Sequence, residues 1–432
     1  MIQKGRLSRQ GSEGGEPAIS FARRHRPDMQ IVLYMSLLML LGLVVMFAIG
    51  PQRANVLNAA FGTEYSDTHF FVKQLTSIGI ALIAFAAMAL IPFRRLLKYD
   101  RTLLFMGIGA CVLLFLASKV GWGIAQESYG ATRWFNLGPL GSLQPAEILK
   151  FGVLVYTALY LAARVKANEL NNWRETLLPL GIVVGVAELL IVVLQRDLGT
   201  GVSLLAIVMT MLIASGMKWK IIGSVVGVVA VAGVLLIATA PHRVDRVATF
   251  FRGDTTSTSD SSSYHIEHAK IAIGTGGFFG VGIGNSVQAT GYLPEAINDS
   301  VFAIMGETFG FVGLVATIVL FVALLMRLLK VMDHLVDFRL KLLVSGVFGW
   351  LAAHVILNIG AMIGLIPLTG ITLPLLSFGG TSMLFIAAAL GLVFQLSRYT
   401  AHGSNLTEIE YENSSSRRRV GGTRYTGRRG VA

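Results

Sequence analysis

The sequence predicts an all-α polytopic membrane protein with about ten transmembrane helices. Of its 432 residues, 54% are hydrophobic and only 14% are charged, whereas soluble domains carry about 25% charged residues. The mean hydropathy is +0.66. Apolar segments of roughly 17–25 residues, each long enough to cross a bilayer, recur along the chain. Together these observations exclude a soluble enzyme, a disordered chain and a coiled coil.

The predicted spans follow one another at short intervals, except for one long polar interval before the eighth. They lie near 31–50, 71–92, 103–121, 147–163, 177–194, 198–216, 221–239, 301–326, 342–366 and 381–397. The tenth is preceded by Leu373-Pro374-Leu375-Leu376, which can form a re-entrant start to that helix. We find no internal repeat, so nothing in the sequence supports an inverted-repeat transporter.

Lysine and arginine are unevenly divided between the two sides of the predicted bundle. Counted over the tails and alternate loops, 26 of the 36 lie on one side, and the positive-inside rule places that side in the cytoplasm. Both termini are then cytoplasmic, and 240–300 is a large extracytoplasmic loop between the seventh and eighth helices. We expect a membrane domain at 30–398 between basic, disordered tails at 1–29 and 399–432.

The net charge of +12 would also suit a nucleic-acid-binding protein. The positive charges, however, follow membrane topology instead of gathering on one binding face. We therefore expect no nucleic acid among the partners. The tails either contact anionic lipid or act only as topology signals.

Polar residues are costly at membrane depth and are functional candidates there. The first cluster is 130–138, which contains Arg133, followed by 144–150. Glu147 and Lys150 are three residues apart and share one helix face. Glu147 also suits the positive N-terminal end of the fourth span. A local ion pair and a ligand contact are both open for this pair.

The second cluster is a tight turn at 195–201, between the fifth and sixth spans. Asp197 is either the N-cap of the sixth span or a ligand contact. Arg196 stands at the outer interface, where a guanidinium is suited to forked contacts with phosphate oxygens.

The third cluster lies in the long outer loop. It contains Arg243, Arg246, His265, His268 and Lys270. The glycine-rich run that follows lacks the Gly-Lys-Ser/Thr ending of a nucleotide P-loop, so it more simply allows tight backbone turns. Two histidines at this spacing are only a weak indication of zinc.

The fourth cluster, 291–300, runs directly into the eighth span. Asp299 ends the loop at the edge of the hydrocarbon, where partial desolvation raises the pKa of a carboxyl group and makes it a better base. An N-cap role is the alternative. Glu307, about two turns further in, needs a partner or a wet cavity. His354 and Asn358 share a face of the ninth span, where we expect an interhelical hydrogen bond.

These clusters, in this order, resemble the SEDS family, the FtsW/RodA/SpoVE proteins of bacterial cell-wall synthesis, over about residues 30–398. The matching blocks are Arg133-Trp134, 144–150, 197–200, 272–277, 284–288, 292–296, Gly306-Glu307, 358–360, 367–370 and 374–382. The Asn-Ser-Val-Gln and Tyr-Leu-Pro-Glu-Ala stretches look more like the FtsW branch, which acts in division, than the RodA branch, which acts in elongation.

The resemblance implies a peptidoglycan glycosyltransferase that polymerises lipid II at the outer face of the cytoplasmic membrane. The donor would be a glycan on undecaprenyl pyrophosphate, and Asp299 matches the family's essential acid. It also implies a class B penicillin-binding protein and other divisome proteins as partners, a septal location, and a divalent cation, Mg²⁺ or Mn²⁺, whose ligands the sequence does not indicate. Candidate substrate-binding residues are Arg133, Glu147, Lys150, Arg196, Asp197, Arg243, Arg246, Lys270, Glu295, Glu307 and Ser377.

Several positions depart from the family pattern. Arg196 stands where a proline is usual, His265 and His268 replace glutamines, Asn298 replaces a threonine, and Thr308 replaces a glutamate. The competing readings are a RodA-type elongation polymerase, a lipid II flippase and a division scaffold. A flippase should carry charges through the whole bilayer thickness, whereas here they concentrate near the outer face, with Glu307 the deepest clear case.

Overall fold

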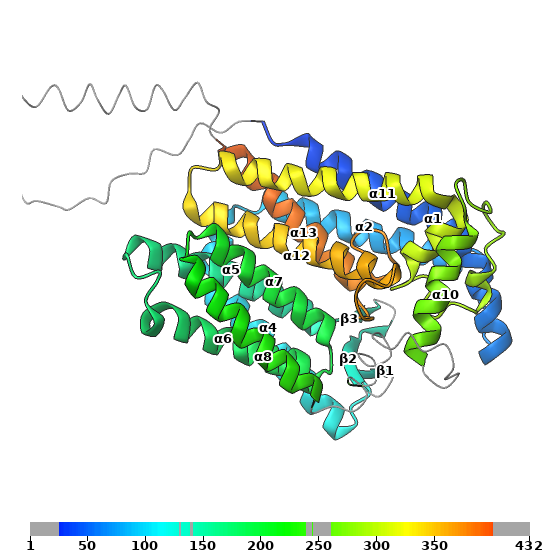
Figure 1. Ribbon diagram of the computed structural model, residues 1–432, viewed down its shortest axis with the longest axis horizontal. Coiled ribbons are helices and arrows are strands. Elements are labelled where there is room, and N and C mark those ends of the chain that lie inside the picture. The colour runs from blue at the N-terminus through cyan, green and yellow to red at the C-terminus, as the bar shows by residue number, and fades with distance from the viewer. Residues whose placement is uncertain (1–25, 129–130, 139–140, 239–243, 245–260, 401–432) are drawn as a thin grey trace, which may run out of the picture.

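The computed structural model describes residues 26–128, 131–138, 141–238, 244 and 261–400. These residues form one bundle of long, roughly aligned helices (Figure 1). Each of the ten predicted spans corresponds to a helix in it, although the ninth helix ends at Met362 and the predicted end at 366 was wrong. They are α1 Met29–Phe61, α2 His69–Leu90, α4 Asp100–Val120, α5 Pro145–Lys166, Trp173–Leu194 (α6 Leu178–Glu188 between two π-helical turns), α7 Leu198–Ala214, α8 Trp219–Ala238, α11 Val301–His334, α12 Phe338–Met362 and α13 Gly380–Leu396.

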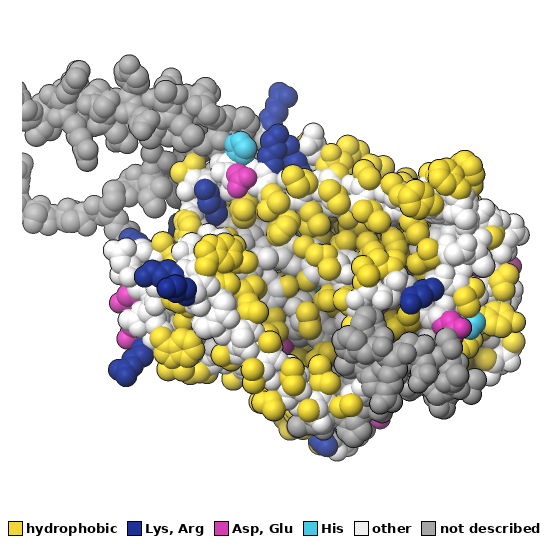
Figure 2. Space-filling view, in the orientation of Figure 1, with side chains coloured by type: hydrophobic (Ala, Val, Ile, Leu, Met, Phe, Trp, Pro, Cys, Tyr) yellow, Lys and Arg dark blue, Asp and Glu magenta, His cyan; other side chains and the backbone are white. Residues whose placement is uncertain are grey.

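Nine of these helices are long and apolar enough to cross a membrane, counting only the described residues, and α7 is a shorter apolar helix. Figure 2 shows hydrophobic side chains over most of the visible lateral face, with Lys and Arg gathered mainly toward one end. That distribution matches contact with lipid tails between two polar boundaries. The chain is therefore a multi-pass membrane protein.

Two helices run further than the hydrophobic pattern predicts. Helix α1 continues through Pro51 to Phe61, and α11 continues to His334. In each case polar residues carry the helix beyond its apolar stretch. Hydropathy detects the apolar part of a helix, whereas the helix ends where its capping geometry stops it, as left-handed Gly62 does for α1.

The connections contain elements that hydropathy does not detect. A three-stranded antiparallel sheet of β1 Ala125–Ser128, β2 Ala131–Asn136 and β3 Ser142–Leu143 lies between α4 and α5. Short helices α3 Phe93–Lys98 and α10 Ser261–Thr275 are outside the spans. The interval 363–379 has no helix, and Leu373, Leu375 and Leu376 in it are buried. Irregular backbone is tolerated at such depth only where protein covers it.

The two ends of the described chain meet at one end of the bundle (Figure 1). Asp28 caps α1 and forms an ion pair with Arg327 of α11. Its backbone N–H donates to the Ser397 hydroxyl at the end of α13 (2.9 Å). An even number of spans requires this arrangement. Which side of the membrane it faces stays a prediction, and the tails 1–25 and 401–432 lie outside the described residues.

Close helix contacts depend on glycine. A β-carbon at Gly107 of α4 would lie 2.5 Å from the Leu149 α-carbon of α5, and one at Gly152 of α5 would lie 2.8 Å from the Leu103 carbonyl oxygen of α4. Small residues let membrane helices approach this closely. The contact fixes α5, whose first two turns carry Glu147 and Lys150.

We predict that Gly107→Ala destabilises the α4–α5 contact by about 1–3 kcal/mol, because backbone stands where the new methyl group would go. Gly109→Ala, on the same helix with nothing within 4 Å of its β-carbon position, is the matched control and should be neutral or stabilising. Thermal unfolding of the detergent-purified variants measures both. Equal melting temperatures for the two variants would contradict this account of the packing.

Candidate functional site

Asp299 lies in the turn that leads into α11. Its backbone carbonyl accepts a hydrogen bond from Nδ2 of Asn358 on α12 (2.7 Å). Within the described part of the chain its carboxylate accepts no hydrogen bond. A β-carbon at Gly370 would lie 3.6 Å from Oδ2 of Asp299. The main chain at this position is therefore fixed while the carboxylate oxygens remain available.

The electrostatic surroundings of Asp299 favour its neutral form. The pKa of the carboxyl group is raised to about 7, mainly by burial and also by the negative charges of Glu295 and Asp197, against an opposing effect of Arg133. A carboxyl group with a pKa near 7 can exchange a proton at ordinary pH. This direction is the one that the sequence predicts for a carboxylate at the membrane boundary.

Asp197 is the N-cap of α7. Its Oδ1 accepts from the Thr200 backbone N–H (3.0 Å), and its Oδ2 accepts from the Thr200 hydroxyl (2.8 Å) and from Nε2 of Gln144 (3.0 Å). The predicted N-cap is thus confirmed. Because both oxygens are hydrogen-bonded, Asp197 acts on Asp299 mainly through its charge.

Two arginines belong to the same turn. Arg133 on β2 donates to the backbone carbonyls of Gln195 (3.3 Å) and Arg196 (2.8 Å), where carbonyls at a helix C-terminus favour a cation. Arg196 is exposed and has a left-handed backbone, with φ of 54°. Proline, with φ near −65°, could not adopt this conformation. The turn therefore differs in backbone from one built on the usual proline.

Glu147 and Lys150 form a buried ion pair, with 2.7 Å between Oε1 and Nζ and side chains 2% and 0% exposed. Lys150 also contacts Nε2 of His354 (3.3 Å) and lies 4.7 Å from the centre of the Trp350 ring. The local ion pair is therefore present, and the His354 contact is the interhelical hydrogen bond expected there. A direct ligand contact by either residue stays a prediction.

Glu295 and Ser377 shape the backbone near Asp299. Glu295 has φ of 48°, and its carboxylate accepts from Nδ2 of Asn298 (2.5 Å). The Ser377 hydroxyl accepts from the Leu373 backbone N–H (2.8 Å). Both side chains thus close turns, and a role of either in binding substrate stays a prediction.

Glu307 has the partner that its depth requires. Its carboxylate accepts from the Ser286 hydroxyl (2.5 Å) and from the backbone N–H groups of Val287 (3.0 Å) and Gln288 (3.2 Å). Three donors around one carboxylate make a charge-assisted anchor. Glu307 therefore fastens the loop 286–288 onto α11.

Helix α10 packs across the loop that ends at Asp299. His265 Nε2 lies 2.6 Å from the Ser300 hydroxyl, and His268 Nδ1 lies 2.8 Å from Oε1 of Gln288. Lys270 packs against Gly364, just beyond the end of α12. The two histidines that replace glutamines thus dock α10. Arg243 and Arg246 lie outside the described residues.

A divalent cation would find few protein ligands here. Among the described residues no group of three or more His, Cys, Asp or Glu side chains could hold a metal ion. Mg²⁺, however, often binds through one or two carboxylates together with water and substrate phosphates. Asp299, whose carboxylate accepts no hydrogen bond from any described residue, would be the protein ligand in such an arrangement.

One acidic residue was missed by the sequence reasoning. Glu188, at the end of α6, lies inside the fifth span, six residues before its end at Leu194. A β-carbon at Gly201 of α7 would lie 2.6 Å from Oε2 of Glu188, and the buried Oε1 has no hydrogen bond in the described structure. A single Glu inside an apolar run was the available signal. One such residue still does not form a charged path across the membrane.

The comparisons with known proteins agree with one another. A family model described as "Cell cycle protein", covering FtsW, RodA and SpoVE, matches residues 28–402. A protein of Nitrosomonas europaea named "Probable peptidoglycan glycosyltransferase FtsW" is 33% identical over 374 residues, which are 86% of this chain and 93% of that protein. The stage V sporulation protein E of Bacillus subtilis is 30% identical over 385 residues, 88% of this chain and 99% of that one.

The fold is similar to that of a solved chain as well. That chain comes from a peptidoglycan synthase complex in which polymerisation and crosslinking are coordinated. The TM-score is 0.67 at 27% identity, and the similarity covers 86% of this chain and 98% of the other. Both chains are therefore covered over nearly their whole membrane parts.

Replacement by asparagine is predicted to have opposite effects on stability at Asp299 and at Asp197. A carboxyl group whose pKa rises on folding, from 3.8 to about 7 for Asp299, binds more protons when folded, so the free energy of unfolding falls as pH rises through that window. Asp299→Asn should therefore stabilise the protein at pH 8, by roughly 1–2 kcal/mol after allowance for partial exposure, and less at pH 5.

Asp197→Asn provides the contrast. It places an amide N–H₂ against the donors of Gln144 and Thr200 and should lower stability by about 1–3 kcal/mol. Melting temperatures of the two purified variants and the wild type at pH 5 and pH 8 test both statements. A destabilised Asp299→Asn at pH 8 would show that this carboxylate supports the fold instead of straining it.

Proposed function

Because this chain belongs to the FtsW, RodA and SpoVE family of cell cycle proteins, we propose that it is a peptidoglycan glycosyltransferase that polymerises lipid II. The family membership supports the class of reaction. The observation in the structure that supports it most is Asp299: its main chain is fixed, its carboxylate accepts no hydrogen bond from any described residue, and its pKa is about 7.

In the proposed reaction the 4-hydroxyl of the lipid II N-acetylglucosamine attacks the anomeric carbon of the glycan on undecaprenyl pyrophosphate. A new C–O bond forms as the C–O bond to pyrophosphate breaks, and the pyrophosphate leaves with the electron pair. Asp299 takes the proton of the attacking hydroxyl. A base with its pKa near the working pH is both available in its ionised form and strong enough to accept a proton.

The pyrophosphate leaving group needs positive charge. Arg196 is exposed on the turn beside Asp197, so its guanidinium can meet phosphate oxygens in a forked contact. Arg133 holds that turn by its backbone carbonyls. Lys150 is fully buried, so in this conformation it acts through its field and through the residues it contacts.

A divalent cation, Mg²⁺ or Mn²⁺, is part of the proposal. The Asp299 carboxylate would hold the cation, which would supply positive charge to neutralise the leaving group. A requirement for the metal is measured by polymerisation with and without a chelator.

The proposed place of action is the outer face of the bacterial cytoplasmic membrane at the division septum. The relatives named FtsW support the division role, and the similarity to a chain of a peptidoglycan synthase complex supports a partner that crosslinks. We propose that this partner is a class B penicillin-binding protein within the divisome. Lipid II polymerisation by the purified protein, with and without the partner, tests the assignment.

Asp299→Asn is expected to abolish glycan formation while the protein still binds lipid II. Asparagine keeps the size of the side chain but cannot accept the proton, and loss of a general base costs about 10²–10⁴ in rate. Polymerisation of labelled lipid II by the purified variant measures the loss. Retention of more than about a tenth of wild-type activity, a smaller loss than a missing base causes, would falsify the assignment of Asp299.

The pH dependence gives a second readout of the same group. Activity of the wild type should decline as pH falls through about 7, because the base becomes protonated. Glu295→Gln removes a negative charge that raises the pKa of Asp299, so it should move this decline to lower pH. An unchanged pH profile in that variant would mean that a group other than Asp299 controls the decline of activity at low pH.

Arg196→Ala should lower kcat/KM for lipid II by about 10–100-fold, the loss expected for a charge-assisted hydrogen bond, without changing stability. Arg196→Lys keeps the charge but loses the forked contact and should fall in between. Arg95→Ala, an exposed arginine on α3, is the control. If Arg196→Ala polymerises at the control rate across substrate concentrations, Arg196 does not contact the pyrophosphate.

A further inference from the structure

One face of α12 holds the irregular segment that runs beside Asp299. His354 and Asn358 are four residues apart, one helical turn, and both side chains are buried. They contact the adjacent residues Thr372 and Ile371 of the segment between α12 and α13. The two contacts fix consecutive peptide groups next to Gly370, where a β-carbon would lie 3.6 Å from Oδ2 of Asp299.

Asn358 joins this segment to the turn that carries Asp299. Its Nδ2 donates to the backbone carbonyl of Asp299 and to that of Ile371, both at 2.7 Å. An amide nitrogen has two hydrogens, so both are used. Because both neighbouring groups are carbonyl acceptors, the nitrogen of the Asn358 amide, and not its oxygen, must face them.

His354 joins the same segment to the buried ion pair. Its Nε2 lies 3.3 Å from Nζ of Lys150, and its Nδ1 lies 3.4 Å from the Thr372 carbonyl oxygen. A lysine ammonium only donates. Nε2 must therefore accept, and the ring proton is on Nδ1, where it faces the carbonyl. The contacts define one neutral tautomer.

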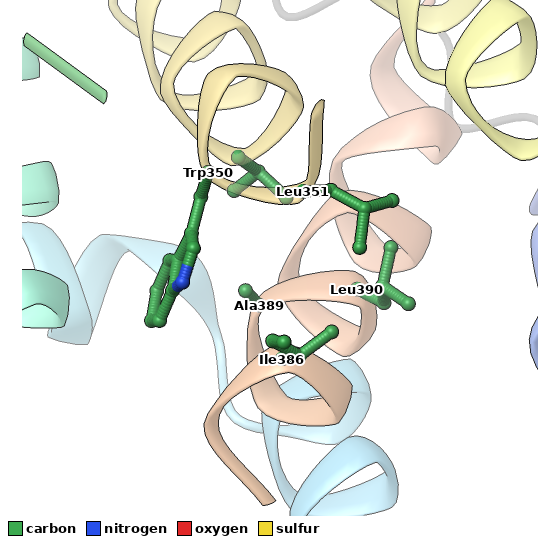
Figure 3. A pocket seen from close by; sticks show the side chains of 6 residues that line it. Trp350, Leu351, Ile386, Ala389 and Leu390 are labelled. Atoms are coloured by element: carbon green, nitrogen blue, oxygen red, sulfur yellow. The ribbon is translucent and has the colours of Figure 1, made fainter. Parts of the chain in front are cut away.

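The far end of this chain of contacts is held firmly. Lys150 forms an ion pair with Glu147, and its ammonium group lies over the Trp350 ring. Trp350 is 1% exposed and fits beside Ile386, Ala389 and Leu390 of α13 (Figure 3). The ion pair is thus enclosed by α5, α12 and α13, the rigid interior of the bundle.

We propose that His354 and Asn358 are positioning residues for glycosyl transfer, which tie the Asp299 main chain and the adjoining segment to the Glu147–Lys150 pair. This inference rests on the proposed function. Neither side chain touches the reacting atoms. They hold the base and the wall beside it in one geometry, and small misplacements of such groups cost up to about 10²-fold in rate.

The test compares two isosteric losses with a conservative variant and a matched control in the full-length protein. Asn358→Leu and His354→Met remove the hydrogen bonds at similar volume, whereas His354→Gln keeps a donor and an acceptor. Ser345→Ala removes a buried interhelical bond on the same helix, to Thr210 (2.8 Å), about 20 Å from Asn358 along the axis. Lipid II polymerisation and hydrogen exchange of peptides covering 296–301 and 370–376 are measured for each.

We expect kcat to fall at least about tenfold in Asn358→Leu and His354→Met with KM within about twofold, and exchange to quicken in both peptides. His354→Gln and Ser345→Ala should stay within about threefold of wild type with unchanged exchange, a small loss by comparison. Rates in the first two variants equal to Ser345→Ala would overturn the proposal. So would failure of both to fold while Ser345→Ala folds, because the two residues would then serve the fold alone.

Failure of the proposed function looks different. Wild-type protein that forms no glycan, alone or with its transpeptidase, refutes polymerisation itself. In that case the exchange experiment still tests whether His354 and Asn358 hold the segment 370–376, since hydrogen exchange requires no turnover. Unchanged exchange in Asn358→Leu would show that the hydrogen bonds do not hold the segment.

Discussion

Every peptide group of an irregular segment inside a membrane bundle must find a hydrogen-bond partner within the protein. Side chains meet this constraint in the segment 363–379. Asn358 and His354 contact the carbonyls of Ile371 and Thr372, and the Ser377 hydroxyl accepts a hydrogen bond from a backbone N–H within the segment. Unsatisfied groups at such depth each cost several kcal/mol. The polar residues of α12 therefore stabilise this segment, which lies beside Asp299.

The acidic residues of the site have different roles. The carboxylates of Asp197 and Glu307 are each surrounded by donors and hold helix starts and loops. Asp299 has its main chain fixed instead, and its side chain is left without a hydrogen bond by any described residue. Burial and the charges of Glu295 and Asp197 make Asp299 a stronger base.

Hydropathy was enough to predict the ten helices, because lipid contact imposes apolar composition over a fixed length. The N-cap role of Asp197 followed from its place before an apolar run. The sheet between α4 and α5 is short and was hidden in a polar connection. The contacts of His354 and Asn358 with the segment 363–379 could not be predicted, since they depend on which loop this helix face meets in three dimensions. Glu188 gave little signal because a single Glu inside an apolar run leaves the segment hydrophobic enough to span a membrane.

The left-handed backbone at Arg196 affects how this turn can be exchanged between relatives. A chain with proline there must orient the neighbouring peptide groups differently, so the two carbonyls that Arg133 now binds would point elsewhere. Residue 196 and strand β2 are thus structurally coupled although some 60 positions separate them. A chimaera that imports the turn alone would leave the guanidinium of Arg133 without its acceptors, and the strand and turn have to be transplanted together.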